Sequence, residues 1–394
     1  MYLVVVIIAA LSALLTPALV TIGAHAASFT VDIRTLEGPS RTSPIVFRRI
    51  RLTGMIEIGD AERLRTLVAP LARQPRVLPE APLATLELSS MGGDLIEGLR
   101  LGYLLREYNL ASVVRRGDFC LSACALAFLG GTAAHSQGET VPSRTIEIGA
   151  RVGFHNFFLN PAVTLARADD DPAASRVHGF NEARGGASRL FRYAIDMGVD
   201  PGRIAGMVGR PPDVWDWMDT ADAFLAYQAC PAPLAWPVAS LQKQATNICN
   251  HATGGQRRLE PDQAQPLTNA QARRLLLEQV QRLLAGSKVK GSLARDLMSA
   301  RVMRDEGNSA ALYADLGAAG LPLPELVGST FRVGPYPAGN AESECIVSIS
   351  PQSPERYRLA LLGPDGLSRP TRSPPGICPG LFLYDALDVI NPRP

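Results

Sequence analysis

The feature that most constrains this chain is a regular alternation of short apolar segments with amphipathic ones, which runs from Val46 to about residue 228. Short apolar or alternating runs predict strands, and apolar side chains three and four positions apart predict helices. The predicted elements follow one another as strand, helix, strand, helix and strand over residues 47–58, 60–71, 84–88, 95–105 and 111–114. This order is typical of an α/β fold, in which helices follow the ends of strands.

Composition divides the chain into five predicted parts. They are an N-terminal segment, an irregular or extended lead-in, the α/β domain, a linker rich in Pro, Gln and Asn, and a C-terminal accessory region, over residues 1–26, 27–45, 46–230, 231–266 and 267–394. The linker could equally be a loop held by a disulfide. In the accessory region, an amphipathic helical segment precedes a small β-rich module that begins near residue 330.

The first residues are typical of an export signal. Leu3 to Leu15 form an apolar run, and Ala24 and Ala26 place small residues at the two positions that a signal peptidase reads. An uncleaved anchor helix is the alternative, and it would tether the protein to a membrane. In either case we expect the rest of the chain to be exported, to a periplasm or an equivalent compartment.

Six cysteines fit an exported protein, in which an even number favours disulfides. Their order does not determine their connectivity. Proximity along the chain suggests three neighbouring pairs, Cys120–Cys124, Cys230–Cys249 and Cys345–Cys378. The alternative for the first pair is two small buried thiols that pack without a bond.

Charge and motifs argue against several classes of partner. The net charge of +2 gives no electrostatic reason to expect nucleic acid. No C-x-x-C or H-E-x-x-H motif is present, so we expect no metal site. Lys243 is the first lysine of the chain, which excludes a serine–lysine arrangement within the α/β domain.

Acyl transfer needs a nucleophile, a base, a group that orients the base, and donors for the oxyanion. Ser122 is the candidate nucleophile, because it stands where a loop enters a small, apolar helix that ends at Gly130 and Gly131. Its neighbours Ala123 and Ala125 are small and let a substrate approach. The alternative is that Ser122 only caps this helix, which is the commonest role of serine at such a position.

His155 is the candidate base. It ends an apolar strand over residues 146–154, and a neutral imidazole there could take a proton near pH 7. The alternative is a core histidine with one hydrogen bond. His135 and His178 lie in polar, loop-like surroundings and are poorer candidates.

Two aspartates of one loop, Asp213 and Asp216, could orient that imidazole. We favour Asp213, because the two preceding prolines fix the backbone before it. The alternative is that both carboxylates are simply solvated. Gly92 and Gly93, between a predicted strand and a predicted helix, would expose backbone N–H groups to a substrate.

Together these segments resemble the Clp protease/crotonase superfamily over residues 46–228. That family has a strand ending in S-P-G-G, then a helix, a strand, a serine that opens a helix, and a histidine at the end of a later strand. Ser90-Met91-Gly92-Gly93, Ser122-Ala123 and Gly153-Phe154-His155 take those places here, with Met91 in place of the proline.

The resemblance implies a core of repeated β-β-α units wound as a spiral, and an oxyanion hole formed by the amides of Gly93 and Ala123. It also implies an acidic residue at Asp213 or Asp216 and, by analogy, a homo-oligomer. Crotonase-type relatives act on acyl-CoA, a cytosolic cofactor. Export argues against that activity, and we expect no cofactor.

The sequence thus predicts an exported serine hydrolase, in particular a peptidase, in which His155 deprotonates Ser122. Its partner would be a peptide or protein substrate. The alternative, from another class of function, is a binding or scaffold protein of the periplasm that kept the fold and lost the chemistry.

Overall fold

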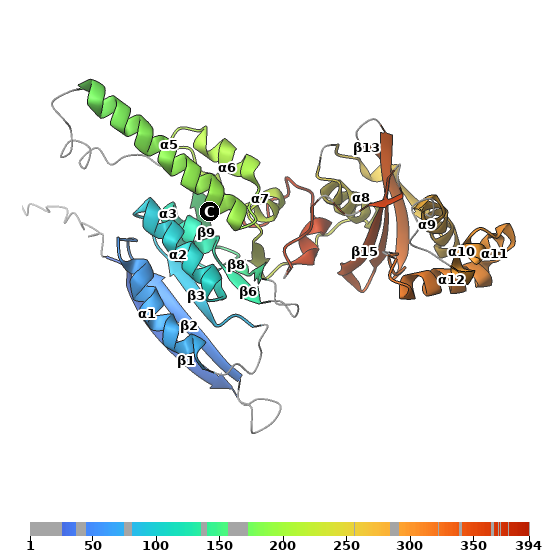
Figure 1. Cartoon of the computed structure of the whole chain (residues 1–394), viewed down its shortest axis with the longest axis horizontal. Coiled ribbons are helices and arrows are strands. Elements are labelled where there is room, and N and C mark those ends of the chain that lie inside the picture. The colour runs from blue at the N-terminus through green and yellow to red at the C-terminus, as the bar shows by residue number, and fades with distance from the viewer. Residues whose placement is uncertain are drawn as a thin grey trace, which may run out of the picture.

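Figure 1 shows a computed structural model of the chain. The structure describes residues 26–36, 45–74, 81–134, 140–156, 172–255, 257–283, 291–321, 323–338, 341–363, 366–368, 370, 372–376 and 378–393. The predicted export signal, apart from Ala26, and His135 lie outside the described residues. No helix within those ranges is both long enough and apolar enough to cross a membrane.

Six of the described strands form the main sheet, in the order β1-β2-β3-β4-β8-β11. Their bounds are Ser28–Leu36, Ile45–Thr53, Ala84–Ser89, Leu110–Val114, Arg144–Glu147 and Cys230–Ala232. β1 pairs antiparallel with β2, and the later neighbours all pair parallel. The fold is therefore mixed α/β, as the sequence predicts.

Of the irregular or extended lead-in predicted over residues 27–45, the first half is extended, because β1 occupies it and joins the main sheet. β1 pairs with β2 in continuous register, from Ser28 opposite Thr53 to Leu36 opposite Ile45. The alternation of Phe29, Val31 and Ile33 with polar residues carried this signal. β1 is an edge strand, and most of its side chains stay exposed.

Two amphipathic helices cover the sheet near these strands, α1 (Asp60–Ala72) and α2 (Leu95–Glu107), and they lie side by side in Figure 1. α1 buries Leu64 and Val68, which are four residues apart and so lie on one helix face. α2 begins where the carboxylate of Asp94 accepts a hydrogen bond from the N–H of Glu97 at 2.8 Å.

The short helix α3 (Ala123–Phe128) lies unusually close to α2. A Cβ atom on Gly98 of α2 would stand 2.5 Å from a backbone carbonyl oxygen of α3, so only glycine allows this approach. Tyr193 of α5 (Pro172–Asp196) packs on Tyr103 of α2 and donates its hydroxyl to the carbonyl of Leu126 of α3 at 2.6 Å. All six residues of α3 are buried, and the helix contacts both α2 and α5.

A smaller sheet of three strands, in the order β10-β9-β5 among the described residues, leads to the candidate site. Their bounds are Asp216–Trp217, Arg151–Phe154 and Phe119–Leu121. β5 pairs parallel with β9, and β10 pairs antiparallel with β9. The other described elements between β1 and β11 are β6, β7, α6 and α7, over Thr132–Ala134, Thr140–Pro142, Pro201–Val208 and Ala221–Ala226.

The C-terminal body is built on an antiparallel sheet in the order β12-β13-β14-β15-β16. Its strands span Ala264–Leu267, Ser329–Ala338, Ala341–Ser350, Ser353–Gly363 and Gly366–Ser368. Helices α9, α10, α11 and α12, over Asn269–Leu283, Ser292–Leu297, Ala300–Arg304 and Glu306–Ala318, gather on one side of it in Figure 1. The predicted helix and β-rich module of the accessory region are both present.

The prediction of a linker over residues 231–266 is wrong. This segment contains helix α8 (Leu241–Ala252), the short helix η1 (Pro261–Gln263) and most of strand β12. The side chains of Ala245, Ile248 and Ala252 are buried at helical spacing, but polar residues between them hide the pattern in the sequence.

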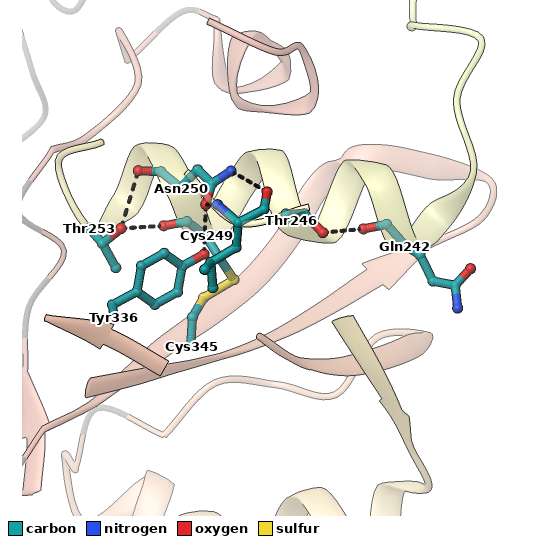
Figure 2. The surroundings of a disulfide bond; sticks show 8 residues. Gln242, Thr246, Cys249, Asn250, Thr253, Tyr336 and Cys345 are labelled. Carbon is teal, nitrogen blue, oxygen red and sulfur yellow. Dashed lines mark hydrogen bonds between the residues drawn. A yellow bond between two sulfur atoms is a disulfide. The ribbon is translucent and has the colours of Figure 1, made fainter. Parts of the chain in front are cut away.

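Disulfides join every cysteine, but not in the predicted pairs. Cys120–Cys124 is confirmed. The predictions of Cys230–Cys249 and Cys345–Cys378 are wrong, because the bonds are Cys230–Cys378 and Cys249–Cys345. Figure 2 shows why: α8 lies across the C-terminal sheet, so that Cys249 faces Cys345 of β14, and the hydroxyl of Tyr336 reaches the Asn250 side chain beside them.

Residues after Cys378 lie against the N-terminal α/β part of the chain. The disulfide between Cys378 and Cys230 of β11 joins them to its main sheet. They form the short helix η3 (Pro379–Leu383). Val389 then forms an antiparallel β-bridge with Thr220. The buried amide of Asn391 accepts a hydrogen bond from the N–H of Gly149 and donates one to the carbonyl of Ala150, both at 2.8 Å. The strand that leads to His155 therefore begins at a turn held by a residue some 240 positions later.

Candidate active site

Ser122 lies at a sharp turn between β5 and α3, with backbone angles φ 54° and ψ −122°. Within the described chain, the other residues with positive φ that are not glycine are Asn109 and Gln228. Such a conformation costs about 1–3 kcal/mol and persists only where surrounding contacts enforce it. Here the N–H of Ser122 donates to the carbonyl of Gly153 at 3.0 Å, and its own carbonyl accepts from the N–H of Leu126 at 3.1 Å.

The hydroxyl of Ser122 does not cap α3. In the described part of the molecule its Oγ makes no hydrogen bond, although the side chain is only partly buried. The alternative role for this serine, that of a helix cap, is therefore wrong. Ser122 combines a strained backbone with a hydroxyl that has no structural task.

The glycine pair forms a turn that packs against Ser122. Gly92 and Gly93 have φ of 108° and 143°, which side chains rarely allow, and a Cβ on Gly92 would stand 2.8 Å from the Cβ of Ser122. Ser90 holds this turn, because its Oγ accepts the N–H of Gly92 at 3.1 Å.

The amides of Gly93 and Ala123 are both available at this turn. In the β-bridge to Ile56, the carbonyl of Gly92 accepts from the N–H of Ile56, and the N–H of Asp94 donates to the carbonyl of Ile56. The N–H of Gly93 takes no part in this bridge. Ala123 is the first residue of α3, so its N–H has no acceptor within the helix. Neither amide donates to another described residue. Two unpaired amides beside one serine are what an oxyanion hole requires.

His155 follows directly after β9, the strand that pairs with β5 just before Ser122. Its Nδ1 lies 2.9 Å from the carbonyl oxygen of Pro212. A carbonyl can only accept, so Nδ1 carries the proton and Nε2 carries the lone pair of the neutral ring. The ring also packs on Trp215, with 4.3 Å between ring centres. The imidazole is partly exposed, unlike a core histidine, and its tautomer and orientation are fixed.

Ser122 and His155 are neighbours through the backbone, since Leu121 pairs with Gly153 in the parallel ladder of β5 and β9. The hydrogen bond from Ser122 Oγ to the imidazole is not formed among the described residues. In unliganded enzymes this bond is often long and shortens when substrate binds.

The structure gives neither aspartate the predicted role of orienting His155. Asp213 is exposed, and the carbonyl of the residue before it contacts the imidazole instead. Asp216 is buried and accepts a hydrogen bond from the hydroxyl of Tyr227 at 2.7 Å, and Arg203 Nε lies 2.9 Å from the same carboxylate. Burial, with the Asp216 charge, raises the pKa of Tyr227, so this phenol stays protonated as the donor.

Sequence reasoning missed Pro212 and Trp215. Every residue carries a backbone carbonyl, so no residue type marks the one that will hold an imidazole. Trp215 gave a weak signal as an aromatic residue next to the candidate aspartates. Both tryptophans of this loop pack over Gly153, where a Cβ would stand 2.8 Å from the Trp217 ring and 3.0 Å from the Trp215 ring.

Within the residues that the structure covers, no group of three or more His, Cys, Asp or Glu side chains could hold a metal ion. A comparison with models of known protein families finds no match, and a comparison with curated proteins finds none either.

Proposed function

We propose that this chain is an exported serine hydrolase that cleaves peptide bonds, with Ser122 as nucleophile and His155 as general base. The observation that carries the proposal is the strained backbone of Ser122, together with a hydroxyl that makes no helix-capping hydrogen bond. Strain of this kind is costly, and a serine that only ended a strand would adopt an ordinary conformation.

In the proposed reaction, Nε2 of His155 takes the proton of Ser122 Oγ as Oγ attacks the scissile carbonyl. The amides of Gly93 and Ala123 stabilise the negative oxygen of the tetrahedral intermediate. The imidazolium returns its proton to the leaving amine, and water then releases the acyl group from Ser122. The carbonyl of Pro212 keeps the ring in place throughout.

Two further observations support the proposal. The motifs shared with the Clp protease/crotonase superfamily, Ser90 to Gly93, Ser122-Ala123 and Gly153 to His155, meet at one place in this structure. The spiral of β-β-α units that this resemblance implies is part of the same proposal. The three disulfides are typical of exported proteins, which argues against chemistry on cytosolic acyl-CoA.

The competing function is a binding or scaffold protein. Its support is that neither Asp213 nor Asp216 contacts His155, and that no hydrogen bond joins His155 to Ser122 Oγ. Only the hydrolase would cleave peptides, so the rate of peptide hydrolysis distinguishes the two functions.

The test is hydrolysis of a library of quenched fluorescent peptides by the full chain, by Ser122→Ala and by Ser188→Ala. Ser188 is an exposed residue of α5 and serves as the matched control. We expect Ser122→Ala to lower kcat/KM by at least about 10³-fold, since loss of the nucleophile removes covalent catalysis. Ser188→Ala should cleave as the natural chain does. If the natural chain cleaves no peptide faster than Ser122→Ala, the scaffold function replaces this proposal.

A further inference from the structure

The proposed nucleophile stands inside the smallest disulfide ring of the molecule. Cys120 belongs to β5 and Cys124 to α3, and their bond closes over the three residues between them, with 5.1 Å between the Cα atoms. Both cysteines are completely buried. The ring contains Ser122 and also Ala123, whose amide is one of the two oxyanion donors proposed above.

The secondary structure around Ser122 is too short to enforce its backbone by itself. β5 has three residues and α3 has six. An isolated helix of that length is unstable in water, because the cost of nucleating it is not recovered. A covalent bond from β5 to α3 fixes the angle between them, which is the angle that the positive φ of Ser122 produces.

The other two disulfides serve a different purpose. Cys230–Cys378 and Cys249–Cys345 join residues 148 and 96 positions apart, whereas Cys120 and Cys124 are four apart. A disulfide restricts the unfolded chain more as its loop grows, so the two long bonds are the ones that stabilise the fold. Two small buried thiols could fill the space of the short bond without it.

We propose that the Cys120–Cys124 disulfide is a positioning device for Ser122, and that it makes the hydrolase active only after export to an oxidising compartment. This inference rests on the proposed function. Before export, the two thiols leave Ser122 and Ala123 unfixed, and the chain is inactive where it is made.

The activating step is thiol–disulfide exchange with a disulfide oxidant, either a protein disulfide or oxidised glutathione. One cysteine thiolate attacks the oxidant and displaces one of its sulfurs as a thiol. The second cysteine thiolate then breaks the mixed disulfide. The chain loses two electrons and two protons, and the oxidant leaves as two thiols.

The test compares two pairs of substitutions in the full chain. Cys120→Ala with Cys124→Ala removes the short bond, and Cys249→Ala with Cys345→Ala removes a long bond as the matched control. For each we would measure the rate of fluorophosphonate labelling, separated into reversible binding (KI) and reaction (kinact), and the midpoint of thermal unfolding.

Loss of the short bond should lower kinact about 100-fold, because small displacements of reacting groups cost about that factor. KI should not change, and the midpoint should stay within a few degrees. Loss of the long bond should lower the midpoint and leave kinact unchanged below the unfolding transition. The proposal is overturned if the pair lacking the short bond is labelled as fast as the natural chain.

Refolding keeps the proposal testable if the variant without the short bond does not fold. The reduced natural chain would be refolded in a glutathione redox buffer, and the three disulfides followed by peptide mapping. Labelling should return together with the Cys120–Cys124 peptide, and recovery in step with only the long bonds would contradict the proposal. The proposed function fails separately, if Ser122→Ala is labelled as fast as the natural chain.

Discussion

The imidazole of His155 is held by the backbone carbonyl of Pro212, which accepts a hydrogen bond from Nδ1 at 2.9 Å. In a Ser-His-Asp triad a carboxylate makes this contact and also stabilises the imidazolium that forms during the reaction. A carbonyl fixes the same tautomer with a dipole in place of a charge. In the mechanism proposed above, this carbonyl orients the base.

The first prediction separates these two arrangements at Asp213. Asp213→Asn should change kcat by less than about tenfold, whereas the same substitution in a true triad lowers kcat by about 10⁴-fold. Peptide hydrolysis at saturating substrate measures this. A loss near the larger figure, with unfolding unaltered, would mean that Asp213 swings onto the imidazole when substrate binds.

The second prediction concerns the oxyanion turn. Gly93→Ala would put a Cβ 2.1 Å from the carbonyl oxygen of Ile56, at a φ of 143°, so the turn must move. Loss of one oxyanion donor lowers kcat by about 10²–10³-fold, and we expect a loss of that size.

Gly59 offers a matched control for this substitution. It also has a positive φ, of 102°, but a Cβ there meets nothing within 4 Å. Gly59→Ala should cost about 1 kcal/mol of stability, because the backbone is strained, and should leave kcat unchanged. Equal kcat values for the two variants would remove Gly93 from the mechanism.

The third prediction concerns Asn391, which ties the turn before β9. Asn391→Ala leaves the N–H of Gly149 and the carbonyl of Ala150 without their partner in a buried place. An unsatisfied buried group costs about 1–3 kcal/mol, so the free energy of unfolding should fall by at least about 2 kcal/mol in a denaturant titration.

Arg393→Ala is the control for Asn391, because Arg393 is mostly exposed and pairs with Asp219 at 3.0 Å. A surface ion pair contributes about 0–1 kcal/mol. If both variants unfold at the same denaturant concentration, Asn391 does not hold the strand that leads to His155.

The sequence predicts well what depends on local pattern. The alternation of apolar and amphipathic segments predicts the α/β order, and small residues around Ser122 predict the short buried helix that follows it. The position of Gly92 after a strand predicts that it packs against Ser122, and the strand that ends before His155 pairs with the strand that ends before Ser122.

What the sequence does not predict depends on contacts between distant segments. Cys249 lies closer in sequence to Cys230 than to Cys345, yet the packing of α8 on β14 decides its partner. One hydrogen-bond partner of His155 is a backbone carbonyl, which no residue type reveals. Helix α8 is rich in polar residues, and it is buried only because it packs on the C-terminal sheet.

The fourth prediction concerns pH and His251 of α8. Burial lowers the pKa of His251 and outweighs the opposite effect of the hydrogen bond between its Nε2 and the carbonyl of Tyr384 at 2.9 Å, so folding disfavours the charged ring. The unfolded chain binds this proton at an ordinary pKa of about 6.5. Stability is therefore complete above that pKa and is lost as the pH falls from about 6.5 toward the lower folded-state pKa.

His251→Gln should weaken this dependence, because glutamine can donate to the same carbonyl and does not titrate. The measurement is the unfolding midpoint at pH 7.5 and at pH 5, for both chains. A fall that is equally large in both chains would show that another group causes the acid sensitivity.

The most direct test of the central claim is to locate the adduct of a fluorophosphonate probe by peptide mass spectrometry. We expect one modified peptide, with the adduct on Ser122, no labelling of Ser122→Ala, and full labelling of the exposed control Ser188→Ala. An adduct on another residue, or undiminished labelling of Ser122→Ala, would contradict the claim that Ser122 is the nucleophile.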